Sequence, residues 1–257
     1  MKRRLTALYE QMLGAYGPRG WWPIPRSAGR RGFDSLGYHP GDFRRPVTPD
    51  GRFEVIMGAV LTQNTAWTNA AAALARLRDA GVSLPADILS LSHRRLAGLV
   101  RSSGYFKQKA KKLKAIAAVF SRPGALTAAG APSRETLLSQ WGIGPETADS
   151  ILLYAFHSPV FVVDAYTRRV LSRIGLIAGG ESYGVIQSIF HASIECNAAL
   201  YNEFHALIVQ HAKQFCRTRP ACVSCPVKPC RTRESSSILN RRSFSARLLP
   251  HGSQRRA

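Results

Sequence analysis

The 257-residue sequence predicts an all-α fold, and three patterns support this prediction. Residues 3–15 place apolar side chains at helical spacing along one face. Residues 102–120 repeat that spacing beside a face that is rich in lysine. Residues 135–155 contain two further helical patterns, separated by a short glycine turn. Because these segments are spread through the chain, we expect helices to make up most of it.

Helical spacing, with glycine and proline as breakers, sets the order of the elements. Residues 24–50 are rich in glycine, proline and arginine, and we expect a long loop there. Apart from the two helices of the glycine turn, helices are expected at residues 3–15, 53–61, 68–80, 85–91, 93–100, 102–120, 165–176, 183–194 and 198–214.

A glycine turn, Gly142-Ile143-Gly144, connects two of the predicted helices. The two glycines allow a tight hairpin and leave backbone N–H groups uncovered. Pro145 suits the first turn of the second helix, where its missing N–H costs nothing. A helix-hairpin-helix of this kind can bind a phosphate through backbone amides, although an αα-hairpin with a glycine turn is also a common connection in helical proteins.

A single carboxylate follows the hairpin at a defined distance. The apolar run Pro159 to Val163 delivers Asp164 to the start of another predicted helix. At that position Asp164 can cap the helix, which is a frequent structural role of carboxylates. A capping carboxylate is also held rigidly and kept ionised by backbone amides and the helix dipole. The capping role is therefore compatible with a chemical one.

The charge of the chain favours a polyanionic partner. The sequence has 36 Lys and Arg against 15 Asp and Glu, a formal charge of +21. Charge alone leaves DNA, RNA and an anionic membrane open. No run of about 18 apolar residues occurs, so no membrane-spanning helix is expected. The N-terminus lacks the apolar core of a signal peptide, and a cytoplasmic location is expected by default.

Four of the five cysteines lie close together near the end of the chain. Cys216, Cys222, Cys225 and Cys230 have the spacing C-x5-C-x2-C-x4-C. In a reducing cytosol this pattern is typical of a metal site rather than of disulfides. Zinc and a [4Fe–4S] cluster are both chemically possible. The fifth, Cys196, is expected to be a buried structural thiol.

The hairpin, the apolar run and Val163-Asp164 together resemble the signature of the helix-hairpin-helix DNA glycosylases of the endonuclease III superfamily. The resemblance implies that Asp164 is the catalytic aspartate and that Gly142, Ile143, Gly144 and Thr147 belong to the DNA-binding hairpin. One departure matters: Glu146 occupies the position of the lysine that forms a Schiff base in endonuclease III. Gly-Ile-Gly-x-Glu-Thr-Ala-Asp is instead similar to the branch that removes 3-methyladenine.

Two further segments extend the resemblance to a base pocket. In the 3-methyladenine branch a Trp-Trp-Pro stretch contributes to that pocket, which implies the same role for Trp21 and Trp22, although paired tryptophans are more often core anchors. The segment that ends in Thr62-Gln63-Asn64-Thr65 is similar to the one that precedes the base-flipping gap. It implies that Gln63 fills the gap, with Asn64 ordering the turn. Trp67 is a third pocket aromatic or a core residue.

The family also has the pattern G-x-[FY]-x-x-K-A-x-x-[IL] beside the DNA backbone, and residues 104–113 match it. The resemblance implies that Lys107 and Lys109 contact phosphates, although a solvated lysine-rich face is the simpler alternative. Many relatives of endonuclease III carry a [4Fe–4S] cluster just after the last helix, which favours that cluster over zinc here. Their usual cysteine spacing is one residue longer in the first and last gaps.

The resemblance implies a fold of two lobes. Residues 50–158 would form a six-helix barrel with the hairpin at its edge. Residues 1–49 would join residues 159–230 in a discontinuous helical lobe that carries the four cysteines. Residues 231–257 contain seven Arg and one Glu and are expected to be a disordered, basic tail.

The resulting hypothesis is a monomeric, nucleoid-associated enzyme of base excision repair that acts on damaged double-stranded DNA. It would hydrolyse the N-glycosidic bond of a flipped alkylated purine, such as 3-methyladenine. Without a lysine at position 146 it would be monofunctional and leave an intact abasic site. Two alternatives stay open: an endonuclease III-like glycosylase for oxidised or mismatched pyrimidines, with or without lyase activity, and a non-catalytic DNA-binding protein.

Overall fold

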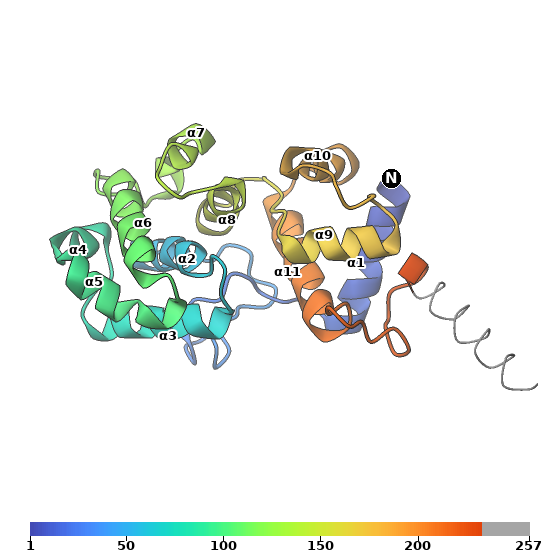
Figure 1. The fold of residues 1–257 in the computed structure, drawn as a ribbon, viewed down its shortest axis with the longest axis horizontal. Helices are drawn as coiled ribbons and strands as arrows, with labels where there is room; N and C mark the ends of the chain where they lie inside the picture. Colours follow the sequence, from blue (N-terminus) through green and yellow to red (C-terminus); the bar gives the residue numbers. More distant parts are fainter. Residues whose placement is uncertain (233–257) are drawn as a thin grey trace, which may run out of the picture.

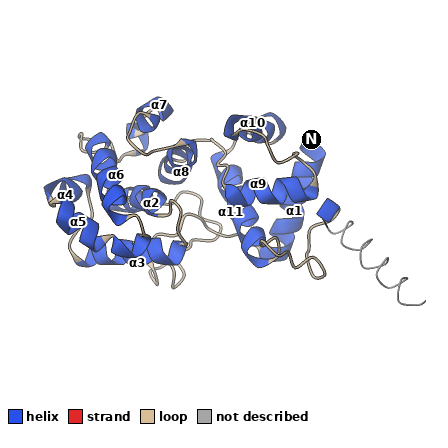
Figure 2. Ribbon diagram, viewed as in Figure 1, coloured by secondary structure: helices blue, strands red, loops and turns tan. Residues whose placement is uncertain are grey.

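The computed structural model describes residues 1–232, and these residues form eleven α-helices and three short 3-10 helices without any β-strand (Figures 1 and 2). The prediction of an all-α fold is confirmed. The predicted basic tail lies, except for its first two residues, outside the described residues. None of the described helices is both long and apolar enough to cross a membrane.

The helices begin and end close to the predicted positions. They are α1 (Lys2–Tyr16), α2 (Pro49–Leu61), α3 (Trp67–Asp79), α4 (Pro85–Ser90), α5 (His93–Leu99), α6 (Phe106–Val119), α7 (Arg134–Leu138), α8 (Pro145–Phe156), α9 (Ala165–Ile174), α10 (Tyr183–Ser193) and α11 (Ala198–Gln214). Helix α2 begins four residues before its expected start at residue 53, with Thr48 as its N-cap and Pro49 in its first turn. Helix α6 was expected from residue 102 and begins later because Gly104 and Tyr105 have positive φ angles of 69° and 44°, which a right-handed helix excludes.

The helices gather into two lobes (Figure 1). Helices α2 to α8 form one lobe, and α1 lies with α9, α10 and α11 in the other. The first helix of the chain therefore packs against the last one, α11, and also contacts α10. The lobe that was predicted as a six-helix barrel contains seven helices, of which α4 and α7 are the shortest. The exact domain boundaries stay a prediction.

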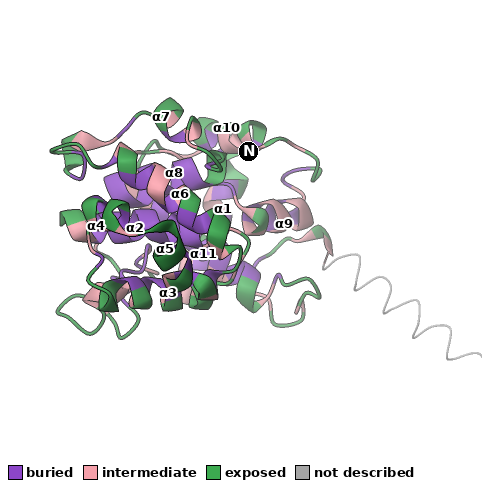
Figure 3. Cartoon of the chain, turned by 60° about the vertical axis from the view of Figure 1, so that its left-hand side comes forward, coloured by how far each residue is buried: buried purple, intermediate pink, exposed green. Residues whose placement is uncertain are grey.

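Helices α2 and α8 form the centre of the larger lobe and pack against each other. Every residue of α2 from Gly51 to Leu61 is buried, and so is every residue of α8 from Thr147 to Phe156 (Figure 3). Because both helices are buried over these whole stretches, other parts of the protein surround them on all sides. The turns that follow α2 and precede α8 are thereby placed at the same edge of the lobe.

A buried carboxylate connects α8 to its neighbours. Asp149 is fully buried and accepts hydrogen bonds from Arg134 Nε and Nη2, at 2.6 and 3.1 Å. It also accepts 2.8 Å hydrogen bonds from the Tyr183 hydroxyl and Gln187 Nε2. Because Arg134 belongs to α7 and the other two donors belong to α10, Asp149 links the hairpin to the second lobe.

We expect Asp149→Ala to lower the free energy of unfolding by roughly 2–4 kcal/mol, because four donor groups would lose their acceptor. Urea denaturation followed by circular dichroism measures this change. The control is Asp79→Ala, which removes an ion pair on the surface, where the Asp79 side chain is 70% exposed. The control should change stability by less than about 0.5 kcal/mol. Equal losses in both variants would contradict the linking role of Asp149.

Candidate functional site

A cavity of about 330 Å³ lies where the two lobes meet. It is lined by the loop after α1, by the turn between α2 and α3, and by parts of α8, α9 and α11. The structure brings six of the predicted site residues together in its wall, namely Trp21, Trp22, Gln63, Trp67, Glu146 and Asp164, together with Thr147 of the hairpin. Asn64 does not line it. This side chain is exposed, and its φ of 52° makes the sharp turn after α2, which agrees with an ordering role.

Asp164 ends the extended segment that crosses between the lobes and caps α9. Its Oδ1 accepts hydrogen bonds from Thr167 N at 2.7 Å and from Thr167 Oγ1 at 2.9 Å. Burial acts to raise the pKa of Asp164, but nearby His205 and the Thr167 donors outweigh it, so the pKa is lowered. The carboxylate is thus ionised at neutral pH and held in one orientation, although its side chain is 13% exposed to the cavity.

His205 is a residue of this site that sequence reasoning missed. Its Nε2 lies 3.6 Å from Asp164 Oδ2. Its Nδ1 lies 2.5 Å from the hydroxyl of buried Tyr154. The only signal in the sequence is a histidine on the last predicted helix, and nothing local indicates that α11 turns it toward Asp164.

Two tryptophans form an aromatic wall of the cavity. Trp21 lies edge-on to the His205 ring, with ring centroids 5.7 Å apart, and Trp22 lies edge-on to Trp67 at 5.5 Å. The backbone of the pair is held from two sides. Asn202 Nδ2 donates to Trp21 O at 2.7 Å, and His39 Nε2 lies 3.0 Å from Trp22 O.

Two features explain this placement of Trp22. His39 belongs to the long loop at residues 24–50, which therefore has a structural role in supporting the wall. Helix α2 approaches the indole closely at Gly58, where an added Cβ would lie 3.0 Å from Trp22 Nε1. A larger residue at position 58 would press on the wall.

Glu146 lies in the first turn of α8 and lines the cavity. Loss of hydration in the cleft and repulsion by Asp164 raise the pKa of Glu146. A carboxyl group here can exchange protons with bound groups but cannot form a Schiff base with an abasic sugar. Lys213 of α11 also lines the cavity, and burial lowers its pKa.

The hairpin turn lies beside the predicted wedge residue. Gln63 Nε2 donates to Thr147 Oγ1 at 2.8 Å and to Gly142 O at 3.2 Å, and Lys112 donates to Gln63 Oε1. Gly142 has a φ of 76°, and a Cβ there would collide with the Lys112 side chain. The N-terminus of α8, capped by Gly144, has no side-chain capping bond, so its amides are open to an anion.

The prediction that Lys109 contacts a phosphate is wrong. Lys109 is only 2% exposed, and its Nζ donates to Leu61 O at 2.8 Å and to Ser103 O at 2.5 Å. Leu61 is the last residue of α2, so the ammonium group satisfies a carbonyl that the helix leaves unpaired. Burial and the neighbouring Lys112 lower the pKa of Lys109 to about 8. Lys107, in contrast, is exposed.

The four clustered cysteines all line one small cavity of about 20 Å³ beside α9 and α11. They are free thiols, with Cys216 buried and Cys222, Cys225 and Cys230 partly buried. Among residues 1–232, no group of three or more Cys, His, Asp or Glu side chains is close enough to hold a single metal ion. Cys196 was expected to be buried, but it lies exposed between α10 and α11, where only an irregular connection passes.

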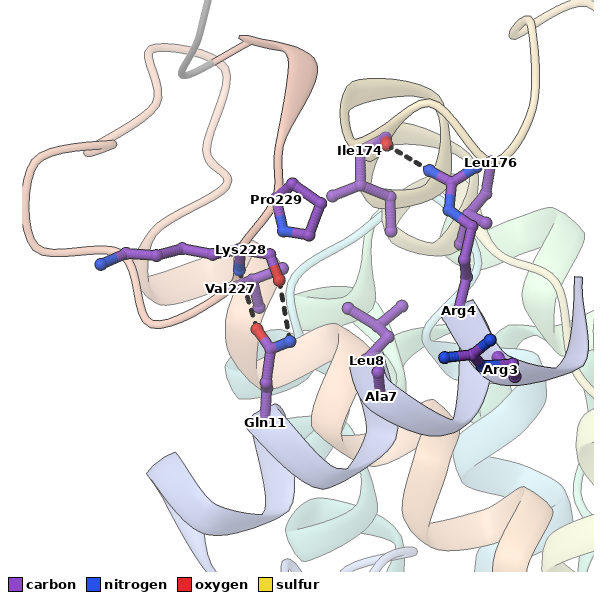
Figure 4. Close-up of a pocket in the computed structure, with 10 residues that line it drawn as sticks. All are labelled: Arg3, Arg4, Ala7, Leu8, Gln11, Ile174, Leu176, Val227, Lys228 and Pro229. Carbon is purple, nitrogen blue, oxygen red and sulfur yellow. Dashed lines mark hydrogen bonds between the residues drawn. The ribbon is translucent and has the colours of Figure 1, made fainter.

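A second cavity, of about 410 Å³, lies between α1 and the cysteine segment (Figure 4). Gln11 closes it through two 2.8 Å hydrogen bonds to the backbone of Lys228, and Arg4 Nη2 donates to Ile174 O at 3.0 Å. It is larger than the cavity between the lobes, but no carboxylate or aromatic side chain lines it. The chemistry of the first cavity makes that one the candidate active site.

Known proteins support this assignment. The family profile described as "HhH-GPD superfamily base excision DNA repair protein" matches residues 57–196. A protein of Methanocaldococcus jannaschii, provisionally named a DNA repair glycosylase, is 36% identical over 228 residues, which cover 86% of this chain and 92% of that protein. Endonuclease III of Sulfolobus acidocaldarius is 27% identical over 179 residues, or 68% of this chain and 79% of that protein.

Two solved structures are similar to the chain. The 3-methyladenine DNA glycosylase of H. pylori, bound to 1,N6-ethenoadenine, is 32% identical with a TM-score of 0.57, and the match covers 67% of this chain and 92% of that one. A trapped endonuclease III–DNA covalent intermediate is 19% identical with a TM-score of 0.71, covering 92% and 99%. The similarity to the endonuclease III complex, at 19% identity, supports the fold alone.

Variants of Lys107 and Lys109 test which of these two lysines of α6 contacts DNA. We expect Lys107→Met to make the slope of log affinity for duplex DNA against log salt shallower by about 0.9, as loss of one phosphate contact does. Lys109→Met should leave this slope unchanged but lower the unfolding midpoint, because two carbonyls lose their donor. Fluorescence anisotropy at several salt concentrations measures the slope. An equal slope change in Lys109→Met would show that this lysine does reach DNA.

Proposed function

Because this chain belongs to the HhH-GPD superfamily of base excision DNA repair proteins and is a DNA glycosylase, we propose that its substrate is an alkylated purine in duplex DNA and that it leaves the strand intact. The observation that carries this proposal is the cavity between the lobes. Its wall joins three tryptophans to one ionised carboxylate.

The aromatic wall suits a cationic base. An alkylated purine such as 3-methyladenine carries a positive charge while it is attached to the sugar, and electron-rich indole rings attract cations. A cavity of about 330 Å³ is suited to one flipped base. Discrimination from normal bases would come from this attraction together with the easier unstacking of a damaged base.

The reaction needs little acid catalysis. The C1′–N bond breaks and its electron pair neutralises the cationic ring, so the base leaves without an added proton. Asp164, as a carboxylate, stabilises the positive charge that develops on the sugar. Water then adds its oxygen to C1′, and Asp164 accepts the proton that the water loses.

The hairpin and Gln63 have supporting roles in this proposal. The open amides at the N-terminus of α8 would bind a backbone phosphate, and Gln63 would enter the gap that the flipped nucleotide leaves. An amide suits the gap because it can both donate to and accept from the orphaned partner base. To do so, Gln63 would exchange its hydrogen bonds with Thr147 and Gly142 for bonds to DNA.

One observation favours a second candidate, a glycosylase that also cleaves the strand. Lys213 lines the cavity, and its lowered pKa would make its amine a better nucleophile. A glycosylase that leaves the strand intact forms no Schiff base through Lys213. Trapping with borohydride distinguishes the two, because only a Schiff base gives a covalent protein–DNA adduct.

We expect wild-type protein to release 3-methyladenine from alkylated duplex DNA, with strand breaks only after alkali and no adduct with borohydride. Asp164→Asn should slow release by at least about 100-fold, because the developing charge loses its carboxylate partner. Single-turnover chromatography of released bases measures both. The matched control is Asp87→Asn, a carboxylate that bonds the N-terminal turn of α4 away from the cavity and should leave the rate unchanged.

Three results would contradict parts of this proposal. Release of an oxidised or mismatched pyrimidine instead of alkylated purines would reject the substrate class. Strand breaks without alkali, lost in Lys213→Met, would support the second candidate. DNA binding that Asp164→Asn leaves intact, with no base released by either protein, would indicate a non-catalytic role.

We also propose that the four clustered cysteines hold a [4Fe–4S] cluster. All four thiols line one cavity, and four cysteine thiolates are the ligand set of a [4Fe–4S] cluster. Four thiolates can also hold zinc, so the metal content distinguishes the two. The cluster would tie the ends of the segment 216–230 together beside α9 and α11.

Chemical analysis tests the cluster. We expect about four iron atoms and four acid-labile sulfides per chain and no stoichiometric zinc. Cys225→Ser should lose the iron and lower the unfolding midpoint, whereas Cys196→Ser, at an exposed thiol outside the group, should keep both. One zinc per chain in place of iron would overturn the assignment.

A further inference from the structure

We propose that His205 is a second functional residue of the active site. It presents its Nε2–H to Oδ2 of Asp164, and Tyr154 sets this orientation. The inference rests on the proposed function for its effect on rate, but the hydrogen-bond arrangement itself is a property of the free protein. His205 is 3% exposed, and among the described residues its Nε2 has no hydrogen-bond partner.

The tautomer follows from the environment of Tyr154. Burial raises the pKa of this phenol well above its ordinary value, so it stays protonated and has one hydrogen to donate. The hydroxyl lies 2.5 Å from His205 Nδ1. If Nδ1 carried a hydrogen and donated instead, the buried phenolic hydrogen would face no acceptor, which is costly. Tyr154 therefore donates to Nδ1, and the imidazole hydrogen lies on Nε2.

Nε2 faces the one carboxylate oxygen that Thr167 leaves open. Both Thr167 donors bond Oδ1, while Oδ2 lies 3.6 Å from His205 Nε2. This separation exceeds that of a formed hydrogen bond, and catalytic contacts of this length commonly shorten when substrate binds. With His205 on Oδ2 and Thr167 on Oδ1, the plane of the carboxylate is set relative to the sugar.

The position of His205 also joins the carboxylate to the base pocket. Its ring lies edge-on to Trp21 at 5.7 Å, so the imidazole packs against the aromatic wall while it faces the carboxylate. The other ionisable groups around the pair are Glu146 and Tyr154 on α8, Arg168 and Tyr166 on α9, and Lys213 on α11. Of the groups in residues 1–232, His205 is the one that both bonds Tyr154 and faces Oδ2.

Single-turnover base release over a range of pH tests the role. His205→Leu removes the donor and should slow release by about 10- to 100-fold, as loss of a hydrogen bond to a charged group does. Since His205 lowers the pKa of Asp164, the acidic limb of the profile should move to higher pH in this variant. His205→Gln keeps an N–H near the Nε2 position and should recover part of the rate. Gln210→Leu, on the same helix outside the cavity, is the matched control.

A measurement without substrate separates this proposal from the proposed function. Nitrogen-15 NMR of the imidazoles should show His205 with hydrogen on Nε2 and a bare Nδ1, its signals assigned by their absence in His205→Gln. Tyr154→Phe should abolish this preference. Hydrogen on Nδ1 in the wild type, or unchanged rate and pH profile in His205→Leu, would overturn the proposal. If the wild type releases no base at all, the proposed function fails, whereas the NMR result still decides the arrangement of Tyr154, His205 and Asp164.

Discussion

The pair of hydrogen bonds from Thr167 to Asp164 is the interaction on which the site depends. It makes Asp164 the N-cap residue of α9 and at the same time fixes the carboxylate at the junction of the two lobes. The helix itself supplies donors to Oδ1 and a favourable dipole. His205 and the Thr167 bonds together lower the pKa of Asp164 and keep the carboxylate ionised although most of its surface is covered.

The remainder of the fold brings partners to that carboxylate. Helices α2 and α8 are buried on all sides, so their ends cannot shift without opening the core. Their adjacent turns carry Gln63 and Glu146 to one wall of the cavity. Helix α11 brings His205 to the opposite wall, and Asn202 of the same helix holds the backbone of Trp21. Asp149 connects these halves through α7 and α10.

Lys109 and His205 show where reasoning from sequence reaches its limit. Both residues are polar and lie on helices, and their neighbours in the sequence do not indicate their surroundings. Lys109 lies in a lysine-rich segment, yet it turns inward and donates to Leu61 O, at the end of α2, and to Ser103 O. His205 looks like an ordinary helix residue, and the packing of α11 against α9 brings it to Asp164. Which side of a helix faces which partner depends on contacts between distant segments.

The sequence by itself determined the helical composition, the order and approximate bounds of the helices, the glycine hairpin and the capping position of Asp164. These properties depend on spacing, on turn residues and on interactions within a few positions, all of which are local. That Trp21 and Trp22 share one cavity with Gln63 and Asp164 was implied only by the family resemblance, and the tertiary structure brings them together. It also decided that Lys109 is structural, that Cys196 is exposed and that His205 and Tyr154 stand behind the carboxylate. The reason is physical: burial and long-range hydrogen bonds depend on how the lobes pack, and packing is a property of the whole chain.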